Sequence, residues 1–481
     1  MMLIKPDRAG YAGGIRPMVA RWIITGEMIL ETAAHFGGES ESMADMMILR
    51  DPLDGLTPLL PGTSLAGALR SHLADVLGGY RSEEHRDVAM LFGASRINDD
   101  EGTQSPLIVF DSFGNLCGKK FEIRDGVAIN PETGTAEKNK KFDIEVLPAG
   151  TIFQIKVELI VEKGLQEPKL VALLVKALEG LNGEISLGMR RSRGLGSIKV
   201  HDWKAIRFDL TSQAGWIQWL TTDHEHPIDE NVTVFNSAHE AIHSAQPALD
   251  IIEVADARKR VAVELHLQLA GDLLVRSPGY DPRAPDAVHL HSAGNPVLPG
   301  TSLAGAMRSQ ALRIARCVRD SQGDGDYWIN RLFGPRIENK QKTASKLRVS
   351  ENFISHNNAR RQTRIAIDRF TGGVVQGALF DEEVCAEGVL KVRIELREPD
   401  DAEAGLFLLL LKDLLSGEIP VGGSTSVGRG ILKGTGTVCL KNGKRCEIGT
   451  NLQVQQDVMD EFDFYIKSFR EYPLSTEEAP A

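Results

Sequence analysis

Two aspartates stand at matching places in the two halves of the chain. Asp45 occurs in "ESMADMMILRDP" and Asp286 in "PRAPDAVHLHS", and the second lies 241 residues after the first. Each falls in an expected loop and precedes a short apolar run. A carboxylate in such a loop can accept a proton as a general base or hold a divalent cation. Loop aspartates are more often turn formers, so spacing alone leaves both interpretations open.

Arginines and glycines alternate in a short segment late in each half. The first segment, "GMRRSRGLG", places Arg190, Arg191 and Arg193 among glycines, whereas the second, "GGSTSVGRG", keeps only Arg429. Glycine lets a backbone approach a ligand closely, and arginine binds phosphate in a bidentate manner. An exposed, solvated turn explains the same residues. A dinucleotide-binding fingerprint fits poorly, because these glycines precede an expected strand and that fingerprint opens a helix.

The longest repeat begins at Leu60 as "LPGTSLAGALR" and again at Leu298 as "LPGTSLAGAMR", 238 residues later. A Pro-Gly turn before apolar residues at helical spacing predicts a helix over 63–77, with Thr63 or Ser64 as its N-cap. The free N–H groups and hydroxyls of such a helix start favour an anion such as phosphate. A closely packed helix start without a ligand accounts for the motif equally well.

These motifs recur in the same order in both halves, so the helices and strands that carry them must also follow the same order. The order is an apolar strand, the LPG motif, an LFG segment, a hairpin ("AINPETG" or "AIDRFTG") and the glycine-rich loop. The chain is therefore a tandem duplication. We assign 1–211 to the first domain, 212–258 to a helical connector without a counterpart, and 259–481 to the second domain with a C-terminal extension. The βαββαβ-like order within each copy predicts an α+β protein made of two ferredoxin-like domains.

The composition restricts the class of protein. The chain has 481 residues, of which 42% are hydrophobic, and no apolar run is long enough to span a membrane. Five scattered cysteines form no CxxC pair, and the first residues do not resemble a secretory signal, so we expect a soluble cytoplasmic protein. A net charge of −11 argues against a nucleic-acid partner unless positive charge gathers locally.

Positive charge does gather in the two hairpin regions. Lysines lie in the first and arginines in the second, at equivalent places. The candidate residues there are Lys138, Lys140, Lys141, Arg364 and Arg369. The histidines show no metal-ligand spacing, so no metal-ligating residue is assigned.

Taken together, these motifs resemble the RAMP superfamily of CRISPR-associated proteins. The similarity rests on the LPG motif, the LFG segment, the "AIDRFTG" hairpin and the glycine-rich loop, and it covers residues 20–205 and 258–440. It is strongest toward backbone subunits of type III effector complexes of the Csm or Cmr kind, fused in tandem as in some type III-D systems. The resemblance implies two RRM-like palms, each with an inserted thumb hairpin.

The resemblance also implies a function in antiviral defence. Such subunits bind a CRISPR guide RNA and other subunits of the complex, and cut complementary target RNA where a thumb flips out a nucleotide. Asp45 matches the position of the cutting aspartate, since an apolar pair, a basic residue and Asp-Pro follow it. Asp286 matches less well, because no Asp-Pro follows. Mg²⁺ or another divalent cation is the implied cofactor, without a dedicated site.

By the same resemblance, the helix starts, the glycine-rich loops and the hairpins contact RNA. The implied RNA-binding residues are Thr63, Ser64, Arg70, Thr301, Ser302, Arg308, Gly188, Arg190, Arg191, Arg193, Gly422, Ser424 and Arg429, with the hairpin residues named above as the thumb. Two alternatives remain open at this point. One is a catalytically silent subunit that only binds guide RNA, and the other is an enzyme that processes guide precursors.

Overall fold

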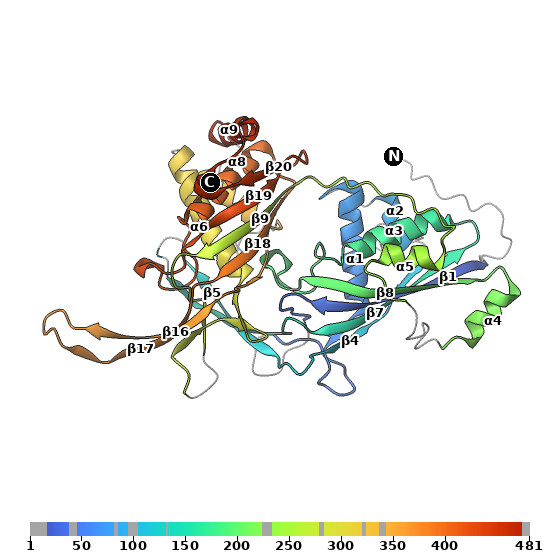
Figure 1. The fold of residues 1–481 in the computed structure, drawn as a ribbon, viewed down its shortest axis with the longest axis horizontal. Helices are drawn as coiled ribbons and strands as arrows, with labels where there is room; N and C mark the ends of the chain where they lie inside the picture. The colour runs from blue at the N-terminus through green and yellow to red at the C-terminus, as the bar shows by residue number, and fades with distance from the viewer. Residues whose placement is uncertain are drawn as a thin grey trace.

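A computed structural model describes residues 17–37, 46–80, 85–94, 104–130, 133, 135–223, 233–278, 283–319, 324–335 and 343–473. The chain forms two bodies that lie side by side, one for each copy of the repeat (Figure 1). Each body has its own extensive cluster of buried apolar side chains. The predicted duplication is therefore visible as two packed cores.

The first body is built on an antiparallel sheet with helices on one face. Its strand order is β2-β4-β7-β1-β8, with β3 also paired to β7. The strands are β1 (Met18–Leu30), β2 (Leu59–Leu60), β3 (Leu107–Val109), β4 (Ser112–Asn115), β7 (Ile152–Glu162) and β8 (Ile198–Asp209). The helices are α1 (Gly62–Gly78), α2 (Arg86–Phe92) and α3 (Glu167–Glu179). Trp22, Ile24 and Met28 alternate along β1 and join the buried core, which fixes the face that the helices cover.

The second body repeats this plan. Its sheet has the order β14-β18-β9-β19-β20. The strands are β9 (Arg260–Leu269), β14 (Leu347–Val349), β18 (Val389–Arg397), β19 (Leu432–Cys439) and β20 (Arg445–Ile448). The helices are α6 (Gly300–Arg319), α7 (Asp324–Phe333), α8 (Asp401–Ser416) and, in the C-terminal extension, α9 (Gln456–Arg470). With a first helix between β9 and β14 and a second between β18 and β19, the predicted ferredoxin-like arrangement is confirmed in both halves.

The start of the LPG helix differs from the expected one. Helix α1 begins at Gly62 with Pro61 as its N-cap, so the prediction of Thr63 or Ser64 as N-cap is wrong. The Gly62 N–H donates to the carboxylate of Asp111 instead, at 2.6 Å. A side chain at Gly62 would overlap the backbone of Val109, and one at Gly300 would overlap Val349. The glycine of the motif thus allows the helix to start against a strand.

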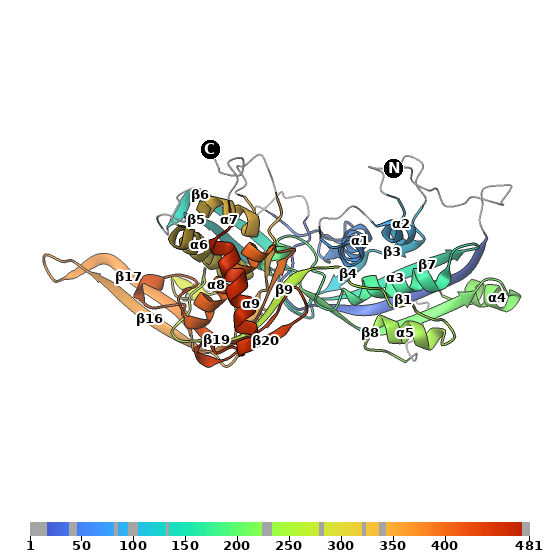
Figure 2. The ribbon, with the colours of Figure 1, turned by 90° about the horizontal axis from the view of Figure 1, so that it is seen from above.

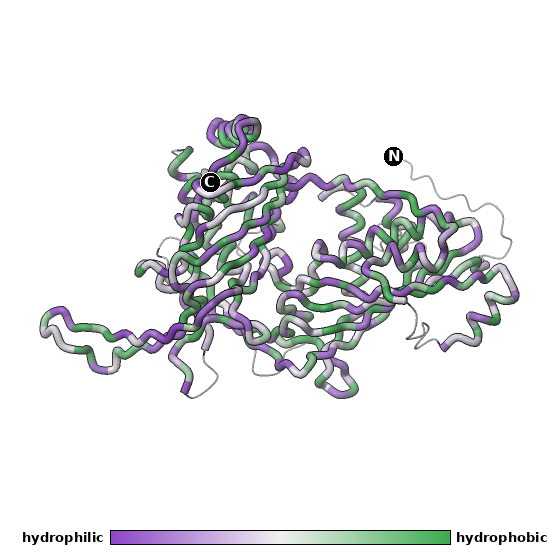
Figure 3. The backbone as a smooth tube through the Cα atoms, in the orientation of Figure 1, coloured by the Kyte–Doolittle hydropathy of each residue, from purple (hydrophilic) through white to green (hydrophobic). Residues whose placement is uncertain are grey.

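Each half also carries an inserted antiparallel hairpin. The first consists of β5 (Glu122–Ile129) and β6 (Ala136–Val146), and the second of β16 (Asn358–Ile367) and β17 (Val374–Ala386). The β5–β6 hairpin lies beside the second body (Figure 2). The β16–β17 hairpin projects from the second body as a long arm (Figure 1). Hydrophobic and hydrophilic stretches both occur along this arm (Figure 3).

The connector is partly helical, with α4 (Gln213–Thr221) and α5 (Ala238–Ala245). Both helices pack against the first body. Trp219 of α4 packs with Phe208 on β8, and Ala241 and Ile242 of α5 join the first core. Within the described part of the chain, no helix is long and apolar enough to cross a membrane.

Candidate nucleic-acid interface

Asp286 lines a cleft between the first hairpin and the second body. The cleft has a volume of about 350 Å³. Its lining residues are Asp125, Arg276, Ser277, Pro278, Asp286, Ala287, Phe380 and Glu382. Asp125 belongs to β5 of the first half, whereas the other residues come from the second half. The two copies therefore build this cleft together.

The backbone around Asp286 is held by the second hairpin. Strand β11 (Ala287–His289) pairs in parallel with β17, where Ala287 lies opposite Glu382. The Asp286 carboxylate is exposed and accepts a hydrogen bond from the backbone N–H of Asp381, at 3.0 Å. This contact orients the carboxylate at the foot of the arm while leaving it open to solvent.

Asp45 lies outside the described residues, but the chain directly after it is placed. Met46 forms a parallel bridge with Ile144 on β6, just as Ala287 does with Glu382 on β17. Two residues further along, the Ile48 N–H donates to Glu145, and the Arg50 guanidinium pairs with the same carboxylate at 2.5 Å. The residue after each candidate aspartate thus meets the returning strand of its hairpin in the same way.

The electrostatics of the cleft centre on Glu382. Its carboxylate pairs with Arg429 at 2.7 Å and with Arg276 at 3.1 Å. Burial opposes ionisation of Glu382, but the two guanidinium groups hold its pKa below the ordinary value. The Arg276 side chain remains 61% exposed, so it offers positive charge at the mouth of the cleft.

Arg429 has a different role from the predicted one. Its side chain is 3% exposed, and its second guanidinium contact goes to Gln362 of β16, at 2.6 Å. Because protein partners surround it, Arg429 does not belong among the RNA contacts. It joins the glycine-rich loop to the foot of the arm, and Arg276 takes its place as the exposed cation.

The carboxylates of the cleft do not form a ready-made cation site. Among the described residues, Asp286 is not part of any group of three metal-ligating side chains whose donor atoms lie within 4.8 Å of one another. Glu382 is already paired with two arginines. The residues present therefore do not fit a resident Mg²⁺, and we derive no chemical step through one.

The LPG helix starts present hydroxyls beside half-buried arginines. Thr63, Ser64 and Thr301 are exposed, and Ser302 is half-buried. Arg308 donates to the carbonyl of Gly334 in the LFG segment at 2.9 Å, so this cation ties two motifs of the second half together. Arg70 is half-buried at the equivalent place in the first half.

The two glycine-rich loops have the same backbone. Each contains a one-turn helix, Arg191–Arg193 or Thr425–Val427, that a residue in the left-handed region precedes. Those preceding residues are Arg190 and Ser424. Gly188 and Gly422 both have positive φ and pack against a backbone carbonyl of the loop after the first strand. The glycines therefore build the loop, whatever the loop then contacts.

Two of the first-loop arginines contact protein. Arg193 donates to the carbonyls of Leu347 and Phe333, both in the second body. Burial, together with nearby Arg308, lowers the pKa of Arg193 to about 10. The Arg190 guanidinium lies 4.5 Å from the centre of the Phe142 ring, while Arg191 is exposed. Of the three, Arg191 is exposed, whereas Arg193 joins the two halves, and RNA contact by these arginines stays a prediction.

The hairpin cations lie where the sequence indicated, at or near the surface. Lys138 is exposed, Lys140 pairs with Glu137, and Lys141 pairs with Asp125, both at 3.0 Å. Arg364 donates to Gln362 at 3.0 Å, and Arg369 lies 4.5 Å from the centre of the Phe370 ring. Each hairpin carries at least as many acidic as basic residues, so these lysines and arginines are local cationic groups on hairpins without the net positive charge that the sequence analysis expected.

Comparison with known families identifies the architecture. The model of the RAMP superfamily matches the chain twice, over residues 28–199 and 278–433. The chain belongs to the RAMP superfamily. The two matched regions fall in the two bodies, so this RAMP protein is a tandem fusion of two family domains. No curated protein matches it.

Membership of the RAMP superfamily makes this chain a CRISPR-associated RNA-binding protein. Three cleft residues escaped the sequence analysis: Asp125, Arg276 and Glu382. Asp125 lies in the other copy of the repeat, and Glu382 lies 96 residues beyond Asp286, so no local pattern links them. Arg276 stands alone between an apolar strand and a Pro-Gly turn, which gives no signal by itself.

Proposed function

We propose that this RAMP protein is a backbone subunit of a type III CRISPR effector complex that holds guide RNA and cuts complementary target RNA. One observation carries the cutting role. The candidate aspartate of the second half is exposed in a cleft that a hairpin of the preceding copy helps to form. The parallel bridges of Met46 and Ala287 support the same role for Asp45.

The proposed chemistry uses the nucleophile that RNA carries. Asp286 accepts the proton of a ribose 2′-OH, whose oxygen then forms a bond to the adjacent phosphorus. The bond from phosphorus to the 5′-oxygen breaks, and this leaving oxygen takes a proton from water. The products are a 2′,3′-cyclic phosphate and a 5′-hydroxyl. Arg276 is placed to pair with the phosphate, and a flipped nucleotide brings the attacking oxygen into line.

The hairpins supply the geometry for that flip. The β5–β6 hairpin is fixed on the second body by Arg124, which pairs with the buried Glu351 at 3.0 Å. Glu122 of the same hairpin accepts the backbone N–H of Ala293 at 2.7 Å. In our proposal this seated hairpin wedges the guide–target duplex beside Asp286. We propose that the projecting β16–β17 arm likewise wedges the guide–target duplex, beside the neighbouring subunit.

Substitution of the two aspartates tests the proposal. In the assembled complex, Asp45→Ala and Asp286→Ala should each remove one cut in the target RNA, by at least about 100-fold in rate. Guide RNA binding should stay unchanged. Asp54→Ala is the matched control, because Asp54 is an exposed loop aspartate that only caps its own turn through Leu56 and Thr57. A double variant that still cuts at both places would refute the nuclease role.

A silent RNA-binding subunit is the second candidate. The contact between Asp286 and the Asp381 N–H favours it, because an aspartate that orders a loop needs no chemistry. Under this alternative, Asp286→Asn keeps an acceptor for that N–H and target RNA remains uncut by the wild type. We further propose that cutting requires a divalent cation that the RNA phosphates help to hold, because the protein alone offers no cage for it. Chelation with EDTA followed by addition of Mg²⁺ checks this requirement.

A further inference from the structure

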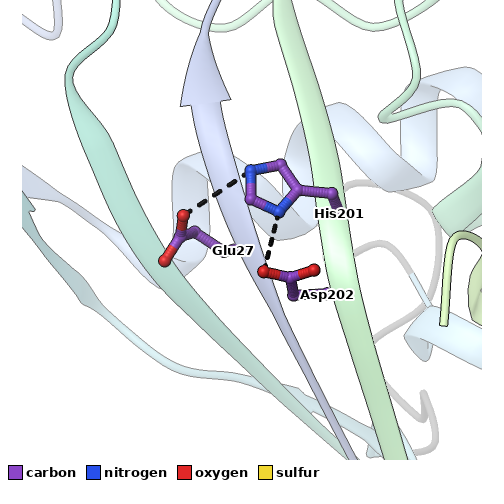
Figure 4. Close-up of side chains that lie close together, drawn as sticks. All are labelled: Glu27, His201 and Asp202. Carbon is purple, nitrogen blue, oxygen red and sulfur yellow. Dashed lines mark ion pairs between the residues drawn. The ribbon is translucent and has the colours of Figure 1, made fainter. Parts of the chain in front are cut away.

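A histidine on the first sheet lies between two carboxylates (Figure 4). His201 of β8 faces Glu27 of β1 through its Nε2 atom, at 3.5 Å from Oε1. Its Nδ1 atom lies 3.1 Å from Oδ2 of Asp202. One donor atom from each residue falls within 4.8 Å of the other two. None of these residues lines the Asp286 cleft.

The two contacts of the imidazole are chemically different. The contact with Asp202 is an ion-pair distance, and in the tautomer that carries its proton on Nδ1 the Nε2 lone pair faces the Glu27 carboxylate. A lone pair facing an anion is unfavourable unless a cation lies between them. A carboxylate on the far nitrogen is also the usual support of a histidine that ligates a metal, since it fixes the tautomer and raises the basicity of the other nitrogen.

The spacing suits a transition metal. Two donors bound to one zinc-like ion at 2.0–2.2 Å lie about 3.4 Å apart in a tetrahedral site. Nε2 of His201 and Oε1 of Glu27 are 3.5 Å apart, while Gln154 holds the other Glu27 oxygen at 2.8 Å. An imidazole with carboxylate oxygens suits Zn²⁺, Mn²⁺ or Co²⁺. The His201 and Glu27 side chains are 32% and 29% exposed, so an ion can reach them.

A β-bulge creates this arrangement. The register of β1 against β8 shifts between Thr25 and Glu27, and Asp202 at the shift has a φ of 53°. Consecutive strand residues normally point to opposite faces, but the bulge lets His201 and Asp202 meet.

The second half supplies an internal comparison. There His266 of β9 lies opposite Thr435 of β19, at the places of Glu27 and His201, and the β9–β19 register runs without a shift. The extra residue at the register shift, Asp202, therefore occurs in the first copy alone, and the duplicated fold does not require it.

We propose that Glu27 and His201 bind a divalent transition metal ion, with Asp202 orienting the imidazole. The ion binds both the Nε2 lone pair and the Glu27 carboxylate, which would otherwise repel each other. Water or a ligand occupies its remaining positions. This site is separate from the cleft, and its existence does not depend on RNA cleavage.

Metal uptake by the full chain tests the site. Co²⁺ titration, followed by d–d absorption, and Zn²⁺ competition should show one equivalent that His201→Ala and Glu27→Gln lose. Asp202→Asn should weaken binding about 10- to 100-fold without abolishing it, as for an outer-shell partner. His266→Ala is the matched control, since this histidine lies 3.6 Å from Glu264 on an equivalent strand.

Two outcomes would overturn the proposal. The first is a wild-type chain that takes up no ion. The second is equal uptake by the wild type and His201→Ala. Circular dichroism of each variant ensures that a loss reflects the site and not unfolding.

Discussion

His289 is a buried titratable residue beside the Asp286 loop. It lies on β11, three residues after Asp286, and is 2% exposed. Its Nδ1 accepts the Val275 N–H at 3.2 Å, which leaves Nε2–H to donate to the Val297 carbonyl at 3.1 Å. Both nitrogens are thus used by the neutral ring. Burial, with a smaller contribution from His291, lowers the pKa of His289 to about 4.

This shift predicts a loss of stability in acid. Above the unfolded pKa of 6.5, the ring is neutral in both states and its contribution is fully present. As the pH falls toward 4, only the unfolded chain binds the proton, so the free energy of unfolding decreases. The loss from this residue is about 2 kcal/mol at pH 5 and about 3 kcal/mol at pH 4.

Urea denaturation at pH 7 and pH 5 measures the effect. The drop in unfolding free energy should be about 2 kcal/mol smaller in His289→Gln than in the wild type. His266→Gln serves as control, because its side chain is 61% exposed and its loss should leave the drop unchanged. An equal drop in His289→Gln and wild type would contradict the assigned role.

At the scale of elements, the two glycine-rich loops share a backbone but not their surroundings. Gly194 has a φ of 88° and Gly428 a φ of 85°. A Cβ at Gly194 would overlap the backbone of Glu351 in the second body, whereas a Cβ at Gly428 would meet no described atom within 4 Å. The first loop is therefore part of the joint between the halves, and the second loop is open.

This difference predicts unequal effects of the same substitution. Gly428→Ala should cost about 1–2 kcal/mol, because alanine is strained at positive φ. Gly194→Ala should cost about 1–3 kcal/mol more, because the new methyl group also displaces backbone across the joint. Thermal unfolding of the full chain compares the two variants. Equal destabilisation would show that the loop does not hold the halves together.

Local sequence patterns were sufficient to predict the helices and strands, but they did not predict the contacts between these elements. The alternation of Val261, Val263 and Leu265 fixed the buried face of β9, and the LPG repeat located α1 and α6. The predicted helix cap was wrong because the helix begins one residue earlier than expected, at Gly62, whose free N–H donates to Asp111, 49 residues further along the chain.

For the candidate site, too, the sequence predicted single residues but not the contacts between elements. Asp286 was found because it precedes the second LPG motif much as Asp45 precedes the first, 12 residues before Leu298 compared with 15 residues before Leu60. The partners of Arg193 and Arg429 were not found, because each lies on an element that only tertiary packing brings close. The Glu27–His201 pair was missed for the same reason, since 174 residues separate its members. The spacing of residues in the sequence predicts single helices and strands, whereas a functional site is built from residues on several of them.

At the scale of the whole molecule, the two copies are joined in series. The hairpin and glycine-rich loop of the first copy contact the second, through Arg124 with Glu351 and Arg193 with Leu347. Tyr80 adds a 2.7 Å hydrogen bond to Glu395 across the same joint. The corresponding hairpin of the second copy projects outward (Figure 1). A head-to-tail contact of this kind is open at both ends, and we expect a similar domain to bind at the projecting hairpin.

The projecting arm carries apolar side chains that its own body does not cover. Ile367 is 64% exposed, Phe370 81% and Leu379 62%. Burying them stabilises a complex only when a partner or RNA is present, because the isolated chain gains nothing from them. Their replacement should therefore change assembly and leave folding unaffected.

The double variant Ile367→Ser and Phe370→Ser tests this separation. Its thermal unfolding should match the wild type, since exposed substitutions away from packed sites usually change stability by less than about 0.5 kcal/mol. Its recovery with guide RNA and companion subunits should fall at least about 10-fold, because two buried apolar contacts are lost. The matched control, Ile217→Ser with Leu220→Ser on α4, replaces two exposed apolar residues outside both hairpins. Normal assembly of the double variant would show that the arm is not a binding element.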